Sequence, residues 1–177
     1  MGKKINAIFF DFDGVIVDSL QLWEQMFDEV VKLYHLDTKC LVENDGMNFT
    51  TNEAIQLMLE NQQRFTNALS AEIIEWTEKF YIDNFHQLLR LNEHVVEVLE
   101  HLKANQIQII LVSNSSKRQV KYAFEQLKLH SYFDHTISAD DVSKGKPNAE
   151  PYLKALSLSE KQKEEVLVIE DSLTGIN

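Results

Sequence analysis

The stretch FFDFDGVIVDS, residues 9–19, places two aspartates one residue apart at the end of an apolar run. The run begins at residue 5 as INAIFF, which is short, continuous and rich in β-branched and aromatic side chains, as expected for a buried parallel strand. Alternate side chains of an extended chain point to the same side, so Asp11 and Asp13 are expected to converge while Phe12 points away. The stretch therefore predicts a strand that ends in a pair of carboxylates.

Polar residues follow two other predicted strands in the same way. Ser113 comes directly after one of them, and Glu170 and Asp171 come after another. Ligands of open α/β sheets bind beyond the carboxyl ends of the strands, so these side chains are expected at one edge of a parallel sheet. The predicted strands are IQIILV (107–112), VLVI (166–169) and, more weakly, HTIS (135–138).

The segment between the first two strong strands has helical periodicity and no strand pattern. Its first helix, within residues 18–34, repeats apolar residues on one face, and its start has the spacing of a capping box at Asp18 and Gln21. Thr50 and Glu53 repeat that spacing, and Ser70 is the expected N-cap of a helix over 71–89. We therefore expect an α/β core from residues 1–15 and 90–177, interrupted by an all-helical insertion over 16–89.

Composition excludes several classes of protein. The chain has 177 residues, 44% of them hydrophobic, and a formal charge of −11 without a basic stripe, which argues against binding to nucleic acid. No apolar span approaches the roughly 20 residues that a membrane helix needs. Cys40 is the single cysteine, so no internal disulfide can form, and we expect a cytoplasmic protein. The oligomeric state stays open.

The polar residues at the strand ends have the chemistry of a phosphate site. Carboxylates are hard oxygen ligands for Mg²⁺, and a hydroxyl and a lysine can hold phosphoryl oxygens. The loop KGKPNAEPY (144–152) offers two such lysines, Lys144 and Lys146, and the resemblance described below favours Lys146. In an isolated pair such as Asp11 and Asp13, one aspartate could equally well cap the next turn while the other is solvated. Only the distant features favour a functional site over that interpretation.

Four segments together resemble the motifs of the haloacid dehalogenase-like hydrolases, in the order found in that family. The resemblance points to the branch that includes phosphoglycolate phosphatase and β-phosphoglucomutase, and it implies a doubly wound, Rossmann-like parallel sheet with an inserted helical cap. The segments are DFDGVIVDS (11–19), LVSNSS (111–116), GKPNAEPY (145–152) and VIEDSLTGI (168–176).

The resemblance also implies a role for each residue. Asp11 would be the nucleophile that forms an aspartyl-phosphate, and Asp13 the general acid and base. Ser113 and Asn114 would bind the transferring phosphoryl group, and Lys146 would neutralise its charge.

A magnesium ion is implied beside these residues, together with a loop that selects the substrate. The ligands would be the Asp11 carboxylate, the Asp13 backbone carbonyl and Asp171, with Glu170 close by. Gly46 marks the substrate-selecting loop of the cap, although an ordinary turn between helices is an equally good interpretation.

The expected activity is a Mg²⁺-dependent phosphatase for a small phosphorylated metabolite such as a sugar phosphate or a phosphoglycolate-like compound. A sugar-phosphate mutase is the alternative, but mutases of this branch carry a histidine where this chain has Trp23. A phospho-acceptor protein and a non-catalytic protein are further alternatives, and the large helical insertion argues against the first. Dehalogenases lack the second acid, so a carbon–halogen substrate is not expected.

Two features depart from the family pattern. Ala149 stands where the third motif usually has a second proline. The sequence stops at EDSLTGIN (170–177), where the family continues with more of the core, so we expect the C-terminal part of the core to be missing and one sheet edge to be exposed.

Overall fold

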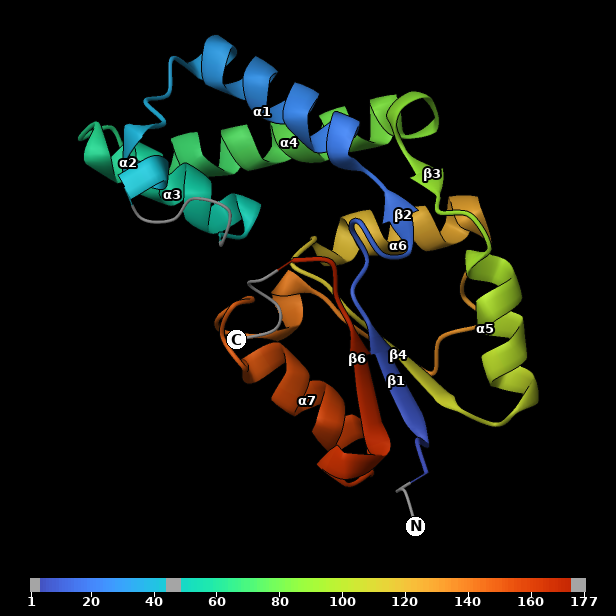
Figure 1. Ribbon diagram of the computed structural model, residues 1–177. Coiled ribbons are helices and arrows are strands. Elements are labelled where there is room, and N and C mark those ends of the chain that lie inside the picture. Colours follow the sequence, from blue (N-terminus) through green and yellow to red (C-terminus); the bar gives the residue numbers. More distant parts are fainter. Residues whose placement is uncertain (1–3, 44–48, 173–177) are drawn as a thin grey trace. The chain divides into compact units, whose positions relative to one another are not determined.

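The computed structural model describes residues 4–43 and 49–172 and divides into two compact units (Figure 1). The first unit combines Met1–Asp18 with Arg90–Asn177, and the second is Ser19–Leu89. The chain thus leaves the first unit after its N-terminal segment and returns to it at Arg90.

The first unit is built on a parallel sheet with the strand order β5-β4-β1-β6. The register places Ala7 beside Gln108 on one side and beside Val166 on the other. The strands β1, β4 and β6 confirm the three strong strand predictions, and β5 confirms the weak one. Their bounds are β1 (Ala7–Phe10), β4 (Gln108–Val112), β5 (His135–Ile137) and β6 (Val166–Ile169).

Helices cover both faces of this sheet, as expected for an α/β fold. In Figure 1, α7 (Glu150–Ser159) lies on one side of the strands and α5 (Val95–Ala104) on the other, and α6 (Lys117–Leu127) belongs to the same unit. Phe9 and Ile110 pack in one cluster with Ala155 of α7. The alternate residues Ile109 and Leu111 are also fully buried, so both faces of β4 are covered. This two-sided burial explains the continuous apolar runs of the sequence.

The strand β6 stands at one end of the sheet order. Leu167 and Val168 are 44% and 40% exposed, although apolar residues in β1 and β4 are buried. The strand end at Ile169 nevertheless lies beside Phe10 of β1, so the residues that follow both strands come together.

The second unit contains only helices among its described residues. Apolar side chains from all four pack into one cluster, which includes Val30, Leu41, Ile55 and Ile73. The buried face of α1, with Leu22, Met26 and Val30, follows the predicted periodicity. The helices are α1 (Leu20–Tyr34), α2 (Lys39–Glu43), α3 (Thr51–Asn61) and α4 (Asn67–Leu88).

The predicted helix caps have mixed outcomes. Thr50 and Glu53 form the expected capping box at the start of α3. The box at Asp18 and Gln21 is wrong, because α1 begins after Ser19 without a side-chain cap.

One further expectation about a helix boundary is wrong, and one pair of short strands was not expected. Helix α4 begins after Thr66, whose side chain accepts from the N–H of Leu69, and Ser70 is buried within the helix. A short antiparallel ribbon, β2 (Val17–Asp18) with β3 (Arg90–Leu91), was missed at the point where the chain leaves and re-enters the first unit. Asp18 is paired with Arg90 in that ribbon, which is why it is not a helix cap.

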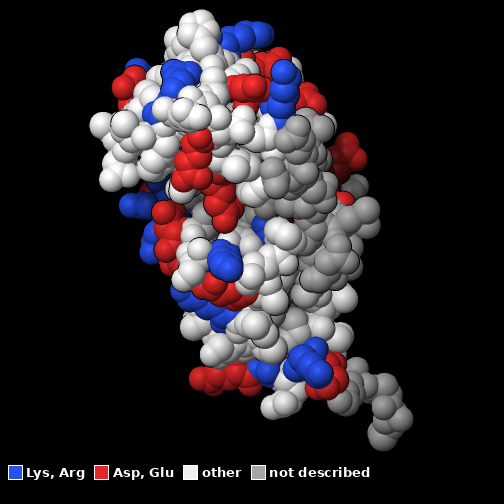
Figure 2. All heavy atoms as spheres, turned by 90° about the vertical axis from the view of Figure 1, so that its left-hand side faces the viewer, with Lys and Arg blue, Asp and Glu red and all other residues white. Residues whose placement is uncertain are grey.

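Charge is mixed over the surface that Figure 2 shows. Acidic and basic side chains are interspersed on that face, and no continuous basic stripe crosses its described part. Within residues 4–43 and 49–172, no helix combines the length and the apolar character that a membrane crossing requires.

Candidate active site

The end of β1 changes from strand to tight turn within a few residues. The N–H of Asp11 still donates to the carbonyl of Ile169 on β6 at 2.9 Å, whereas the next N–H, that of Phe12, donates to the Asp11 side chain at 2.7 Å. The N–H of Gly14 then donates to the carbonyl of Val17 at 2.7 Å and closes the turn. The buried Asp11 carboxyl is thereby fixed at the tip of the strand.

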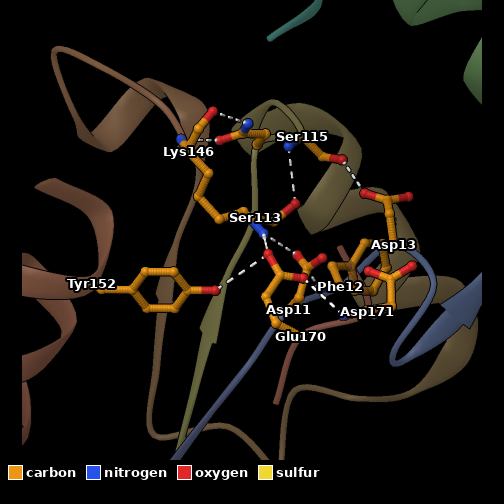
Figure 3. A network of polar contacts seen from close by, with 10 residues as sticks. Asp11, Phe12, Asp13, Ser113, Ser115, Lys146, Tyr152, Glu170 and Asp171 are labelled. Atoms are coloured by element: carbon orange, nitrogen blue, oxygen red, sulfur yellow. Dashed lines mark hydrogen bonds and ion pairs between the residues drawn. The ribbon is translucent and has the colours of Figure 1, made fainter. Parts of the chain in front are cut away.

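Asp11 and Asp13 both belong to the polar network of Figure 3, while Phe12 between them is fully buried. The Phe12 ring packs against Phe124 of α6, with 6.2 Å between the ring centroids. The buried Phe12 ring anchors the residue between the two aspartates, and the convergence of the Asp11 and Asp13 carboxylates stays a prediction.

Gly14 is required at its position for two reasons. Its φ is +84°, in the left-handed region that L side chains rarely adopt. A Cβ at this position would also overlap the carboxylate of Asp171. A side chain at position 14 would therefore require both a strained backbone and a shift of the Asp171 carboxylate.

Lys146 connects the two carboxylates at the centre of the network. Its Nζ lies 2.6 Å from Asp11 Oδ1 and 2.9 Å from Glu170 Oε1, and the residue is only 6% exposed. Burial lowers the pKa of Lys146, but the two carboxylates outweigh burial and raise it above its ordinary value, so the ammonium stays charged. Lys144, the alternative lysine, is exposed.

Three carboxylates could together hold a metal ion. Asp11, Glu170 and Asp171 each offer an oxygen, and these oxygens all lie within 4.8 Å of one another. The Asp13 carboxylate is not part of this group. The family resemblance had implied that Asp13 binds the metal through its backbone carbonyl. A set of hard oxygen donors of this kind suits a cation such as Mg²⁺ or Ca²⁺.

Burial and neighbouring charges shift the pKa values of these three carboxyls in different directions. Burial raises the pKa of Asp11 to about 8, Lys146 opposes this effect, and Glu170 reinforces it. Burial also disfavours charge on Glu170, but hydrogen bonds from Asp11 and Lys146 lower its pKa below the ordinary value. Partial burial and the charge of Glu170 raise the pKa of Asp171. A divalent cation would relieve this repulsion, so the residues present fit a metal site.

The loop after β4 brings Ser113 to the same edge of the sheet. The Ser113 N–H donates to the carbonyl of Ile137 on β5 at 2.9 Å, and its Oγ accepts from the N–H of Ser115 at 2.9 Å. Because the Ser113 oxygen already accepts a hydrogen bond, its hydroxyl proton is available for donation to a ligand oxygen.

Asn114 holds the backbone of Lys146 with its side chain. The Asn114 amide accepts from the Lys146 N–H at 2.8 Å and donates to the Lys146 carbonyl at 2.9 Å. Asn114 was expected to bind the phosphoryl group of the substrate. Its side chain joins two loops that lie 32 residues apart. No pattern in the sequence indicated this contact.

Two other residues of the network were missed by the sequence analysis. Ser115 donates its hydroxyl to Asp13 Oδ2 at 2.7 Å, and the Tyr152 hydroxyl lies 3.5 Å from Glu170 Oε1. Ser115 could have been noticed from its place two residues after Ser113 in the same loop. Gly46, the predicted substrate-selecting residue, lies outside the described residues.

Comparison with known proteins gives a consistent result. The family model described as haloacid dehalogenase-like hydrolase matches residues 8–177. A curated relative from Caldanaerobacter subterraneus subsp. tengcongensis, provisionally named pyrophosphatase PpaX, is 34% identical over 96% of this chain and 74% of its own length.

A second relative and a solved structure agree with the family match. The phosphorylated carbohydrates phosphatase of Thermotoga maritima is 28% identical over 97% of this chain and 79% of its own length. The crystal structure of CbbY from Rhodobacter sphaeroides in complex with phosphate has a TM-score of 0.80 and 21% identity, and the match covers 97% of this chain and 80% of that one. The comparison with CbbY shows a shared fold.

Proposed function

Because the chain belongs to the haloacid dehalogenase-like hydrolase family, we propose that it is a Mg²⁺-dependent phosphatase that hydrolyses a small phosphorylated metabolite through an aspartyl-phosphate intermediate. The observation that carries the proposal is the buried Lys146, which lies between Asp11 and Glu170 with the Asp171 carboxylate close by. This arrangement combines a nucleophile, a fixed positive charge and a set of cation ligands at one sheet edge.

The first step transfers the phosphoryl group to Asp11. A carboxylate oxygen of Asp11 attacks phosphorus, and the bond from phosphorus to the leaving oxygen breaks with its electron pair on that oxygen. The carboxyl of Asp13 gives its proton to the leaving oxygen, so a neutral alcohol departs.

The second step restores the enzyme. The Asp13 carboxylate takes a proton from water as the water oxygen attacks phosphorus, and the bond from phosphorus to the Asp11 oxygen breaks with its electron pair on Asp11. Inorganic phosphate leaves, and Asp13 is again protonated.

Positive charge must meet the phosphoryl group, because Asp11 is itself negative when it attacks. The Lys146 ammonium and the Ser113 hydroxyl are suited to hold two phosphoryl oxygens. The cation, which we propose to be Mg²⁺, would be held by Asp11, the Asp13 carbonyl, Glu170 and Asp171, and it would screen the negative charge of the phosphoryl oxygens. Asn114 contributes by fixing the main chain of Lys146.

In this proposal, residues 1–15 and 90–177 form the catalytic core and residues 16–89 form the cap. The names of the two relatives point to phosphorylated carbohydrates and to pyrophosphate, so a sugar phosphate or a phosphoglycolate-like compound is the first candidate and pyrophosphate the second. Trp23, at the position where mutases of this branch carry a histidine, packs on Tyr81 at 5.9 Å between ring centroids. This packing supports a phosphatase over a sugar-phosphate mutase. The single cysteine favours a cytoplasmic setting.

Release of inorganic phosphate from a panel of compounds tests the proposal. The panel contains sugar phosphates, phosphoglycolate, pyrophosphate and p-nitrophenyl phosphate, each with Mg²⁺ and with EDTA. We expect turnover that requires Mg²⁺ and that Asp11→Asn abolishes. Stable labelling without release would instead indicate a phospho-acceptor protein, and no chemistry from a folded chain would indicate a non-catalytic one.

A further inference from the structure

Ser115 joins two parts of the candidate site that are remote in sequence. Its hydroxyl donates to Asp13 Oδ2 at 2.7 Å across a separation of 102 residues, and its N–H donates to Ser113 Oγ at 2.9 Å (Figure 3). The side of the network that contains Ser113 is therefore connected directly to Asp13.

The main chain fixes Ser115 in this position. Its carbonyl accepts from the N–H of Ala139 at 3.0 Å, and the residue is only 4% exposed. Ser116, the next residue, is the N-cap of α6 and forms a capping box with Gln119. A hydroxyl held on both sides in this way can fix the carboxyl to which it donates.

The direction of the hydrogen bond matters for proton transfer. Since Oδ2 of Asp13 accepts from Ser115, the acidic proton of a neutral Asp13 carboxyl is better carried on Oδ1. A general acid must lie within hydrogen-bond reach of the leaving oxygen, so the rotation of its carboxyl decides whether the proton can be delivered.

We propose that Ser115 is a positioning residue for Asp13, which holds the carboxyl so that its Oδ1 proton reaches the leaving oxygen. The inference rests on the proposed function, because it assigns the acid role to Asp13. It predicts an effect on the chemical step and not on substrate binding.

The proposal makes the effect of Ser115→Ala depend on the leaving group. An alkoxide is strongly basic and requires a proton as the bond to phosphorus breaks, whereas p-nitrophenolate is stable without one. Loss of the hydroxyl should therefore slow the first step with alkyl phosphates and spare the first step with p-nitrophenyl phosphate.

The experiment measures kcat and KM at saturating Mg²⁺ over a series of phosphate monoesters, from glycerol phosphate to p-nitrophenyl phosphate. For Ser115→Ala we expect kcat/KM, which reports the first step and not the hydrolysis of the aspartyl-phosphate, to fall about tenfold or more on the alkyl esters and less than about twofold on the aryl ester, since a general acid contributes about 10²–10⁴-fold in total. Inhibition by inorganic phosphate should stay within about twofold, because Ser115 is not proposed to bind the substrate. Ser115→Thr keeps the hydroxyl and should restore most of the lost rate.

A neighbouring serine provides the matched control. Ser116→Ala removes the same hydroxyl from the N-cap of α6, so it should lower the stability of the fold without changing the dependence on the leaving group. In an Asp13→Asn background, Ser115→Ala should cause no further loss, because the group that it positions is gone. Circular dichroism confirms that each variant is folded, and Ser115→Cys replaces Ser115→Ala if the alanine variant does not fold.

The outcomes distinguish a failure of the role of Ser115 from a failure of the proposed phosphatase function. An equal fall of kcat/KM on all esters in Ser115→Ala, or a further loss in the Asp13→Asn background, would overturn the role of Ser115 while hydrolysis that depends on Asp11 stands. If the wild-type protein releases no phosphate from any ester, or Asp11→Asn releases it undiminished, the proposed function fails and the role of Ser115 fails with it.

Discussion

The stability of the cation-free protein should depend on pH through the carboxyl of Asp11. Burial raises the pKa of this group to about 8, so the folded chain keeps a proton there at neutral pH. The unfolded chain releases that proton above about pH 4, the ordinary range of an aspartate. The contribution of Asp11 to stability is therefore largest below about pH 4, and it is lost as the pH rises toward 8.

The size of the effect follows from the release of one proton on unfolding. One proton corresponds to about 1.4 kcal/mol per pH unit, so the free energy of unfolding should fall by about 3 kcal/mol between pH 5 and pH 7 through Asp11 alone. Asp11→Asn has no proton to release. The difference in unfolding free energy between the wild type and this variant should change by about that amount, because the titrating groups remote from this cluster are common to both proteins.

Urea denaturation in EDTA at pH 5, 6 and 7, followed by far-ultraviolet circular dichroism, measures this difference. Trp23 and Trp76 both lie in the helical unit, so tryptophan fluorescence reports whether that unit unfolds together with the first unit. Added Mg²⁺ should stabilise the wild type more at pH 7 than at pH 5, since it competes with the proton. A difference between the wild type and Asp11→Asn that stays constant within about 0.5 kcal/mol from pH 5 to pH 7 would refute the reasoning.

Three substitutions test other parts of the structure. Asn114→Ala removes both hydrogen bonds to the Lys146 backbone, and it should weaken competitive inhibition by inorganic phosphate about tenfold, since one or two lost hydrogen bonds amount to about 1–2 kcal/mol. Gly14→Ala places a Cβ against the carboxylate of Asp171, and it should weaken Mg²⁺ binding by at least about tenfold in isothermal titration calorimetry, as a distortion of about 1.4 kcal/mol suffices. Thr66→Ala removes the N-cap of α4, and it should lower the stability of the helical unit by about 1 kcal/mol in urea denaturation followed by tryptophan fluorescence.

Each substitution has a result that contradicts its reasoning. Unchanged inhibition by phosphate in Asn114→Ala would mean that the loop holds Lys146 without the amide. Wild-type Mg²⁺ affinity in Gly14→Ala would show that Asp171 moves aside freely or does not bind the ion. For Thr66→Ala, a loss that appears only in circular dichroism and not in fluorescence would place the effect outside the helical unit.

The strands were predictable because their burial is written locally in the sequence. The runs that became β1 and β4 are almost entirely apolar, since both faces of a central parallel strand are covered, and the run that became β6 is apolar although two of its residues are exposed. The ribbon of Val17 and Asp18 with Arg90 and Leu91 was not predictable, because its strands are two residues long and lie far apart in the chain. The capping box of Thr50 was found and the supposed cap at Asp18 was wrong, because only the second residue is drawn into a long-range pair.

For the site, the types of residue could be predicted from the sequence, whereas the contacts between them could not. The residue types at the strand ends indicated which groups would gather there, and Lys146 does reach Asp11. The contact of Ser115 with Asp13 and that of Asn114 with the Lys146 backbone depend on the path of loops that no periodic pattern describes. Local patterns therefore predicted the ingredients of the site, whereas the fold decides which group supports which.

The fixed position of Lys146 has a consequence for the affinity with which a phosphate ester is bound. A lysine side chain that becomes immobile loses up to about 2 kcal/mol of rotamer entropy. Here Asp11 and Glu170 hold the ammonium and Asn114 holds its main chain, so that loss occurs once, during folding. An incoming phosphoryl group meets a cation that is already preorganised, and no part of its binding free energy is spent on recruiting a mobile lysine from the solvent.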